Sequence, residues 1–237
     1  CHRYRPNAQM QQKDRGEPLM PLLLAIDRSQ SKGSWALLKD ETVIIDGFFQ
    51  EALPRSPTWF PSILEGLTKE NLKPSDIQAY LVGTGPGSFS GIRAVLAAIQ
   101  GLALPTKTPV LGVTSVAAMA YAHHKQTNAD KVAIVGDARR GKLWLASYDF
   151  SNATTEAIAK APVLITKEEL SEHIEKGSHL LTPEYAKLSA LLNSLADCKL
   201  IQGDGQVTAK DLAMLYIAYP DAALRDPLPV YLHPAVS

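Results

Sequence analysis

One pattern occurs twice in this sequence and limits the folds that the chain can adopt. An apolar run that ends in an acid, 22–27, leads into a polar turn with a glycine and then into a second run with a tryptophan. The same order returns over 132–148. An unbroken apolar run fits a strand buried on both faces, as in sheets that helices cover. The repeat therefore predicts two tandem α/β units with a boundary near residue 130.

Hydrophobic periodicity and turn residues fill in the elements of each unit. In the first unit, we expect strands over 22–27, 34–38, 42–49, 79–83 and 109–113, and helices over 57–67, 91–104 and 115–125. In the second unit, we expect strands over 132–137, 143–148, 163–165, 179–181 and 199–201, and helices from 166, over 183–195 and over 207–218. We expect a first α/β lobe over 20–129, a second over 130–237, and a flexible leader or cloning remnant over 1–19.

A glycine-rich turn joins a predicted strand to a predicted helix. The residues of interest in it are Gly83, Gly85, Pro86, Gly87, Ser88, Ser90, Gly91 and Arg93. Glycine permits close approach of another backbone or of a ligand, and Ser90 is expected to cap the helix. Free N–H groups at a helix start favour an anion. The residues alone leave two interpretations open: an anion-binding loop, or a tight turn that lets the helix pack closely on the sheet.

Familiar catalytic motifs do not fit this sequence. A Walker A loop needs Lys and Ser or Thr after the last glycine, where Ile92 and Arg93 stand, and a dinucleotide loop needs Gly at Ser88. The histidines form neither HExxH nor a Cys/His zinc pattern, and the serines do not form G-x-S-x-G. These absences disfavour a zinc enzyme and a serine hydrolase.

Two acids end the repeated strands, Asp27 and Asp137. Ligands of open α/β sheets gather at the carboxyl ends of strands, so the two acids could face one cleft and hold Mg²⁺ through water. Alternatively, each acid caps the turn that follows it. Arg139 and Arg140 could meet an anion or a partner's acid, although a solvated turn is the commoner outcome.

The helix after the glycine turn is apolar nearly all round. Large residues form one face, and small residues form another: Ala94, Ala97, Ala98 and Gly101. Such a helix is either fully buried or half covered by another protein.

Charge and cysteine content narrow the function classes. Lys+Arg and Asp+Glu number 24 each, whereas proteins that coat a duplex carry a basic excess. That balance, and the absence of an aromatic stacking motif, disfavour an RNA-binding module acting alone. Two cysteines without CxxC spacing favour a reducing cytosol. No apolar run approaches the length of a membrane span, so we expect a cytoplasmic protein that does not enter membranes.

Five segments, in this order, resemble the TsaB (YeaZ) family. They are Leu24–Ser29, Gly85–Arg93, Gln100–Ala103, Gly112–Ser115 and Asp137–Gly141. The resemblance covers roughly residues 20–150 well and is weaker beyond. It implies the actin/Hsp70/sugar-kinase fold with two duplicated α/β lobes. It also implies a partner subunit in making threonylcarbamoyladenosine (t6A) at position 37 of tRNA.

The resemblance further implies that the chain is not itself an enzyme. TsaD, the catalytic relative, binds its metal through HxxxH, and here Ser115 and Met119 stand at those positions. Neither side chain can replace an imidazole at an iron or zinc site of that type. The chain would hold no metal or cofactor of its own, and ATP or ADP with Mg²⁺ would be bound, if at all, at a partner interface. The implied partners are a TsaD-type transferase in a heterodimer, a TsaE-type ATPase, and tRNA through the complex.

The first-lobe helices would form the docking surface in this family. The residues implied here are Trp59, Phe60, Ile63, Leu67, Ala94, Ala97, Ala98 and Gly101. An apolar face used for a homologous partner could pair with itself, so we expect a homodimer when the chain is alone. One departure is Arg28, which replaces a family Thr and weakens a phosphate role at Asp27. The alternative function is an ATP-binding or ATP-hydrolysing enzyme of the same fold that uses Asp27, Asp137 and the glycine turn.

Overall fold

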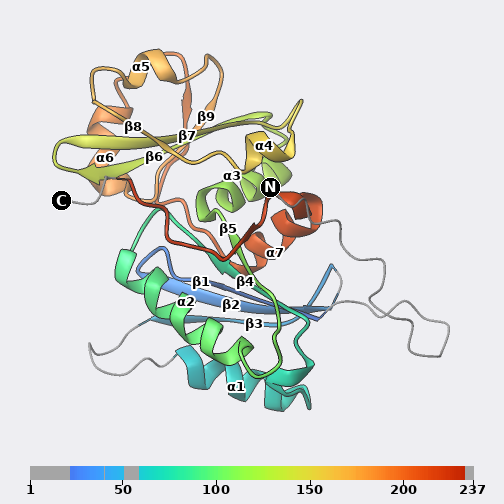
Figure 1. Ribbon diagram of the computed structural model, residues 1–237. Helices are drawn as coiled ribbons and strands as arrows, with labels where there is room; N and C mark the ends of the chain where they lie inside the picture. Colours follow the sequence, from blue (N-terminus) through green and yellow to red (C-terminus); the bar gives the residue numbers. More distant parts are fainter. Residues whose placement is uncertain (1–21, 40, 51–58, 233–237) are drawn as a thin grey trace.

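The computed structural model describes residues 22–39, 41–50 and 59–232, which form two mixed β-sheets with helices around and between them (Figure 1). The predicted leader 1–19 and the start of the helix predicted over 57–67 lie outside the described residues. Among the described residues, no helix is long and apolar enough to span a membrane.

The first sheet has the strand order β11-β5-β4-β1-β2-β3. Its strands are β1 (Leu22–Asp27), β2 (Lys32–Lys39), β3 (Thr42–Gln50), β4 (Ala79–Gly83), β5 (Val110–Val113) and β11 (Leu224–Arg225). β1 pairs parallel with β4 and antiparallel with β2, and β2 and β3 complete the predicted meander. Every residue of β1 and β4 is buried, as their unbroken apolar runs predict.

The second sheet repeats this arrangement with the order β10-β9-β6-β7-β8. Its strands are β6 (Lys131–Arg139), β7 (Lys142–Asp149), β8 (Val163–Ile165), β9 (His179–Leu181) and β10 (Lys199–Leu200). In both sheets, the first strand has two antiparallel strands on one side and two parallel strands on the other, and the first sheet adds β11 antiparallel at its edge. The prediction of two tandem α/β units is confirmed.

Helices cover both faces of the first sheet. The helices of both lobes together are α1 (Trp59–Lys69), α2 (Phe89–Ala103), α3 (Ser115–Thr127), α4 (Thr155–Ile158), α5 (Leu170–His173), α6 (Tyr185–Leu192) and α7 (Ala209–Ala218), with 3₁₀ turns η1 (Pro74–Asp76) and η2 (Pro220–Ala222). α1 and α2 pack on the face that carries Leu24 and Ile26. α3 and α7 pack on the face that carries Leu23 and Ala25, and they lie between the two sheets (Figure 1).

The end of the chain returns to the first sheet. α7 packs on β1, β2 and β4, and β11 pairs antiparallel with β5. Up to β5 the strands belong to the first sheet, and from β6 to β10 they belong to the second. α7 and β11 then return to the first lobe and connect it to the second. The boundary at residue 130 as a limit between domains stays a prediction.

Candidate interlobe site

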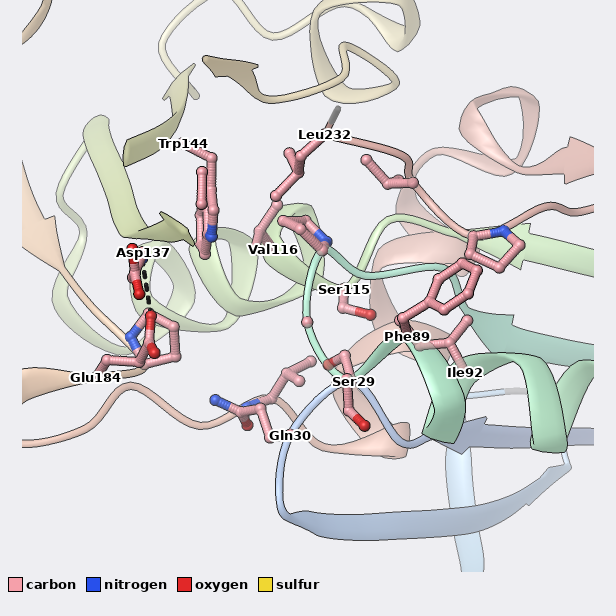
Figure 2. A pocket seen from close by; sticks show the side chains of 18 of the residues that line it. Ser29, Gln30, Phe89, Ile92, Ser115, Val116, Asp137, Trp144, Glu184 and Leu232 are labelled. Carbon is pink, nitrogen blue, oxygen red and sulfur yellow. Dashed lines mark hydrogen bonds between the residues drawn. The ribbon is translucent and has the colours of Figure 1, made fainter. Parts of the chain in front are cut away.

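A cleft of about 980 Å³ lies between the two lobes. The β1–β2 turn, the glycine turn, the start of α3, the β6–β7 hairpin and the tail over 229–232 all contribute to its walls. Figure 2 shows Asp137 and Glu184 on one wall, Phe89 and Ile92 on the opposite wall, and Ser115 and Val116 between them. The fold therefore brings the glycine turn and both repeated turns to one place.

Asp27 is sealed beneath this cleft and is only 1% exposed. Its carboxylate accepts hydrogen bonds from the Ser29 amide (2.8 Å), the Ser29 hydroxyl (2.7 Å) and the Ser115 hydroxyl (2.6 Å). Burial raises the pKa of Asp27, although these hydrogen bonds oppose the shift. Because its oxygens serve internal donors, this geometry fits the turn-capping interpretation and does not fit a Mg²⁺ ligand.

The glycine turn packs directly against this buried carboxylate and the turn beside it. A Cβ on Gly83 would lie 1.8 Å from Asp27 Oδ2, and one on Gly87 would lie 2.0 Å from the Ser29 carbonyl oxygen. The Ser88 amide donates to that carbonyl (2.7 Å), and the Gly85 amide donates to the Ser115 hydroxyl (3.0 Å). These N–H groups are used inside the protein, which favours the close-packing interpretation over an anion loop.

The residue that caps α2 differs from the prediction. Ser88, not Ser90, accepts a hydrogen bond from the Gly91 amide (3.3 Å), and the helix begins at Phe89. The prediction of Ser90 was wrong because Ser88 is held at the helix entry by its own amide bond to the Ser29 carbonyl. Ser90 is an exposed residue of the first turn.

Asp137, in contrast, lies on the cleft wall. Its carboxylate pairs with Lys187 of α6 and accepts a hydrogen bond from the Arg139 amide (2.8 Å), and Glu184 accepts one from the Asp137 amide (2.8 Å). Partial burial alone would raise the pKa of Asp137, but the Lys187 ammonium and the Arg139 contacts hold it below its ordinary value. Asp27 and Asp137 thus do not converge on one ion.

Ser115 and Met119, which stand where the resemblance places the metal histidines of TsaD, also line the cleft. The Ser115 hydroxyl joins Asp27 to the glycine turn, as described above. Met119 is buried, and its sulfur would lie 2.9 Å from a Cβ on Gly205. Within the described part of the chain, no group of three or more His, Cys, Asp or Glu side chains could hold a metal ion.

The predicted docking residues divide into two groups. Trp59, Ile63 and Leu67 of α1 belong to the core and are at most 3% exposed, so they cannot contact a partner directly, and Phe60 is half-buried. This corrects the expectation for α1, whose helical stripe packs on β3 and on Trp35 of β2 rather than facing solvent. On α2, however, the small-residue face is open: Ala94, Ala97 and Gly101 are exposed and Ala98 is half-buried.

Similarity to known proteins agrees with this architecture. The family model described as "tRNA N6-adenosine threonylcarbamoyltransferase" (TsaD) matches residues 57–197, more than half of the chain. The chain is 34% identical to the tRNA threonylcarbamoyladenosine biosynthesis protein TsaB of Escherichia coli, over 60% of this chain and 64% of that protein. It is 28% identical to TsaB of Bacillus subtilis, over 57% of this chain and 58% of that protein.

The chain belongs to the TsaB (YeaZ) family. It spans about three fifths of the length of the curated relatives it matches. Among solved structures, YeaZ from Pseudomonas aeruginosa superposes with a TM-score of 0.72 at 23% identity, covering 90% of this chain and all of that one. At that identity, the likeness shows a shared fold.

Sequence reasoning missed two contacts that close the cleft. The Gln30 side chain donates to the Gly205 carbonyl (2.6 Å) and accepts from the Val207 amide (3.1 Å), which ties the β1–β2 turn to the entry of α7. The Val230 amide donates to the Thr84 carbonyl (2.9 Å), so the tail lies along the glycine turn. A single glutamine in a polar turn carries no signal of a partner about 175 residues away. The family resemblance is weak beyond residue 150 and gave no indication of this contact of the tail.

Proposed function

We propose that this chain is a non-catalytic partner subunit in the t6A modification of tRNA, and that it supports a TsaD-type transferase by docking to it. The family membership supports the pathway, because TsaB relatives carry t6A biosynthesis in their names. The subunit would act in the cytoplasm, with a TsaE-type ATPase joining the complex and tRNA reached through it.

The observation that carries the docking role is the two-sided character of α2. Ile92, Val95 and Ile99 are at most 2% exposed and hold the helix on the sheet. The opposite face presents Ala94, Ala97 and Gly101 to solvent, and Leu104 beyond its end is 77% exposed. Small residues let a second helix approach closely, and an apolar face that stays open on a folded chain is typical of a protein interface.

The cleft supports the non-catalytic part of the proposal. Asp27 serves internal donors, Lys187 neutralises Asp137, and Ser115 and Met119 replace the metal histidines of the catalytic relative. The chain's own residues therefore offer a Mg-nucleotide neither an open carboxylate at Asp27 nor the Ser88 amide. Any ATP or ADP would depend on residues of the partner.

The test uses two substitutions on the open face, Ala97→Arg and Gly101→Leu. A Cβ on Gly101 would meet nothing within 4 Å, so the larger side chain should not disturb the fold. An arginine at Ala97 would bury an unpaired charge in the interface. We expect each variant to weaken binding to the transferase by at least about tenfold, measured by light scattering after size-exclusion chromatography.

The matched control is Ala190→Arg, an exposed alanine on α6 of the second lobe. It adds the same charge to a helix and should leave the complex intact. Unchanged docking of both α2 variants would refute the interface. If the wild-type chain alone runs as a dimer that Ala97→Arg dissociates, the same face also serves self-association.

A further inference from the structure

The chain end and the start of α2 together build an aromatic cluster at the cleft. The rings of Phe89 and Tyr231 lie 5.5 Å apart between centroids at an interplanar angle of 62°. The Arg93 guanidinium lies over the Phe89 ring, 5.2 Å from its centroid. Phe89 and Tyr231 are 142 positions apart in the sequence, so no local aromatic motif marks them.

Tyr231 keeps most of its surface open although the tail is firmly held. Pro227 and Pro229 are buried, and the Val230 amide bonds to the Thr84 carbonyl. Tyr231 nonetheless remains 61% exposed and Phe89 44% exposed. These anchors hold the tail without the Tyr231 ring, so that the ring is a preorganised aromatic surface supported from one side by Phe89.

Charged side chains of both signs line the cleft beside the cluster, and the formal charge of the chain is zero. Arg139 and Arg140 line the same cleft, and the Arg139 guanidinium lies 3.6 Å from the Asp137 carboxylate. The acids there have internal partners: Lys187 pairs with Asp137, and Glu184 and Asp204 accept the amides of Asp137 (2.8 Å) and Tyr185 (2.5 Å). Within the described part of the chain, Arg140 makes no ion pair. Arg140 is thus a cation of the cleft that can contact a phosphate without giving up an ion pair.

We propose that Tyr231, backed by Phe89 and Arg93, is a stacking platform for an unpaired base of a single-stranded RNA loop. Unpaired bases stack on aromatic rings and arginine planes, and arginines contact the neighbouring phosphates. A loop rather than a duplex fits, because stacked base pairs leave no face for Tyr231 to cover. This inference rests on the proposed function, in which the chain contributes to a complex that acts on tRNA.

The test measures RNA binding and partner docking separately. The probe is an anticodon stem-loop RNA with an unmodified adenosine after the anticodon, labelled for fluorescence anisotropy and mixed with the full chain and a TsaD-type transferase. We expect Tyr231→Ala to weaken RNA binding by about tenfold. Tyr231→Phe should retain binding because it keeps the ring. Leu228→Ala is the matched control, since Leu228 is a 69% exposed apolar residue of the same tail without a ring.

Two further measurements identify the contact. With 4-thiouridine in the loop, photocrosslinks should map to the tail peptide around Tyr231. Blunt duplex RNA should bind wild type and Tyr231→Ala equally. Equal affinity of wild type and Tyr231→Ala for the stem-loop, or absence of stem-loop binding by the wild type, would overturn the platform.

The docking result separates this inference from the function on which it rests. If Tyr231→Ala loses transferase binding instead of RNA binding, Tyr231 is a protein contact and the platform is refuted. If the wild-type chain does not dock the transferase, the proposed function fails, and the anisotropy comparison is then made on the chain alone. Loss of affinity in Tyr231→Ala would still support the platform there, and equal affinity would refute it.

Discussion

Asp27 and Asp137 hold equivalent places, because each lies near the carboxyl end of the first strand of its sheet and the two sheets share an order of five strands. Their surroundings differ. Around Asp27, the donors are an amide and two hydroxyls, and the carboxylate is 1% exposed. Around Asp137, the main donor is a lysine that is itself half exposed.

The difference shows how duplicated lobes can diverge while their topology stays the same. In the first lobe, the start of α3 and the glycine turn pack over the end of β1 and bury Asp27. We call this packed group of Asp27, Ser29, Gly83 and Ser115 the Asp27 junction. In the second lobe, α6 supplies Lys187, and the strand end stays on the cleft wall. The first lobe carries α2, the proposed docking helix, and the packing around Asp27 fixes where that helix begins.

The largest loss of stability is expected when a methyl group is added at Gly83, in the Asp27 junction. In Gly83→Ala, the Cβ would overlap Asp27 Oδ2 and lie 2.7 Å from the Ser115 hydroxyl, so the whole hydrogen-bonded group must shift. We expect the free energy of unfolding to fall by about 3 kcal/mol or more, measured by urea denaturation. The counterpart is Gly141→Ala in the Asp137 hairpin, where a Cβ meets nothing but φ is +76°. It should cost only about 1–2 kcal/mol. Equal losses of unfolding free energy in the two variants would contradict the contrast between the surroundings of Asp27 and those of Asp137.

Removal of the two carboxylates should give a smaller but still unequal pair of effects. Asp27→Ala leaves the buried donors of Ser29 and Ser115 without an acceptor and should cost about 2 kcal/mol. Asp137→Ala removes an ion pair that water screens and should cost about 1 kcal/mol or less. Thermal or urea unfolding of both variants measures the difference. If Asp137→Ala loses as much stability as Asp27→Ala, the surroundings of Asp137 are as tightly packed as those of Asp27.

The pH dependence should have opposite signs at the two acids. The raised pKa of Asp27 gives stability that is present below the ordinary aspartate value of 3.8 and is lost as pH rises through the folded-state pKa. The lowered pKa of Asp137 gives stability that is present above 3.8 and is lost as pH falls through the folded-state pKa. Wild type should therefore gain stability relative to Asp27→Asn as pH falls from about 7 to 3, and lose it relative to Asp137→Asn. Urea midpoints of wild type and both variants, measured across this pH range, test the prediction. If the two stability differences change in the same direction with pH, the opposite pKa shifts of Asp27 and Asp137 are refuted.

The elements that were predicted most accurately are those with strong local signals. The bounds of β1, β4, β8 and β9 agree with the expectation, because unbroken apolar runs end at polar or glycine residues. The helix expected from 166 is limited to α5, and α6 is shorter than expected, since their apolar periodicity is weak. α4 and β11 were not predicted, because such short elements are fixed by the surfaces on which they pack.

The sequence alone determined the duplicated α/β architecture, the family and the two-faced character of α2, because these depend on the order and spacing of residues along the chain. Only the tertiary structure decided that Asp27 is sealed while Asp137 faces the cleft, and that the stripe on α1 is core. It alone brought Tyr231 onto Phe89. Asp27 and Ser115 are 88 positions apart, and Gln30 and Gly205 are 175 apart. Contacts across such separations are set by how the lobes pack, which no local pattern encodes.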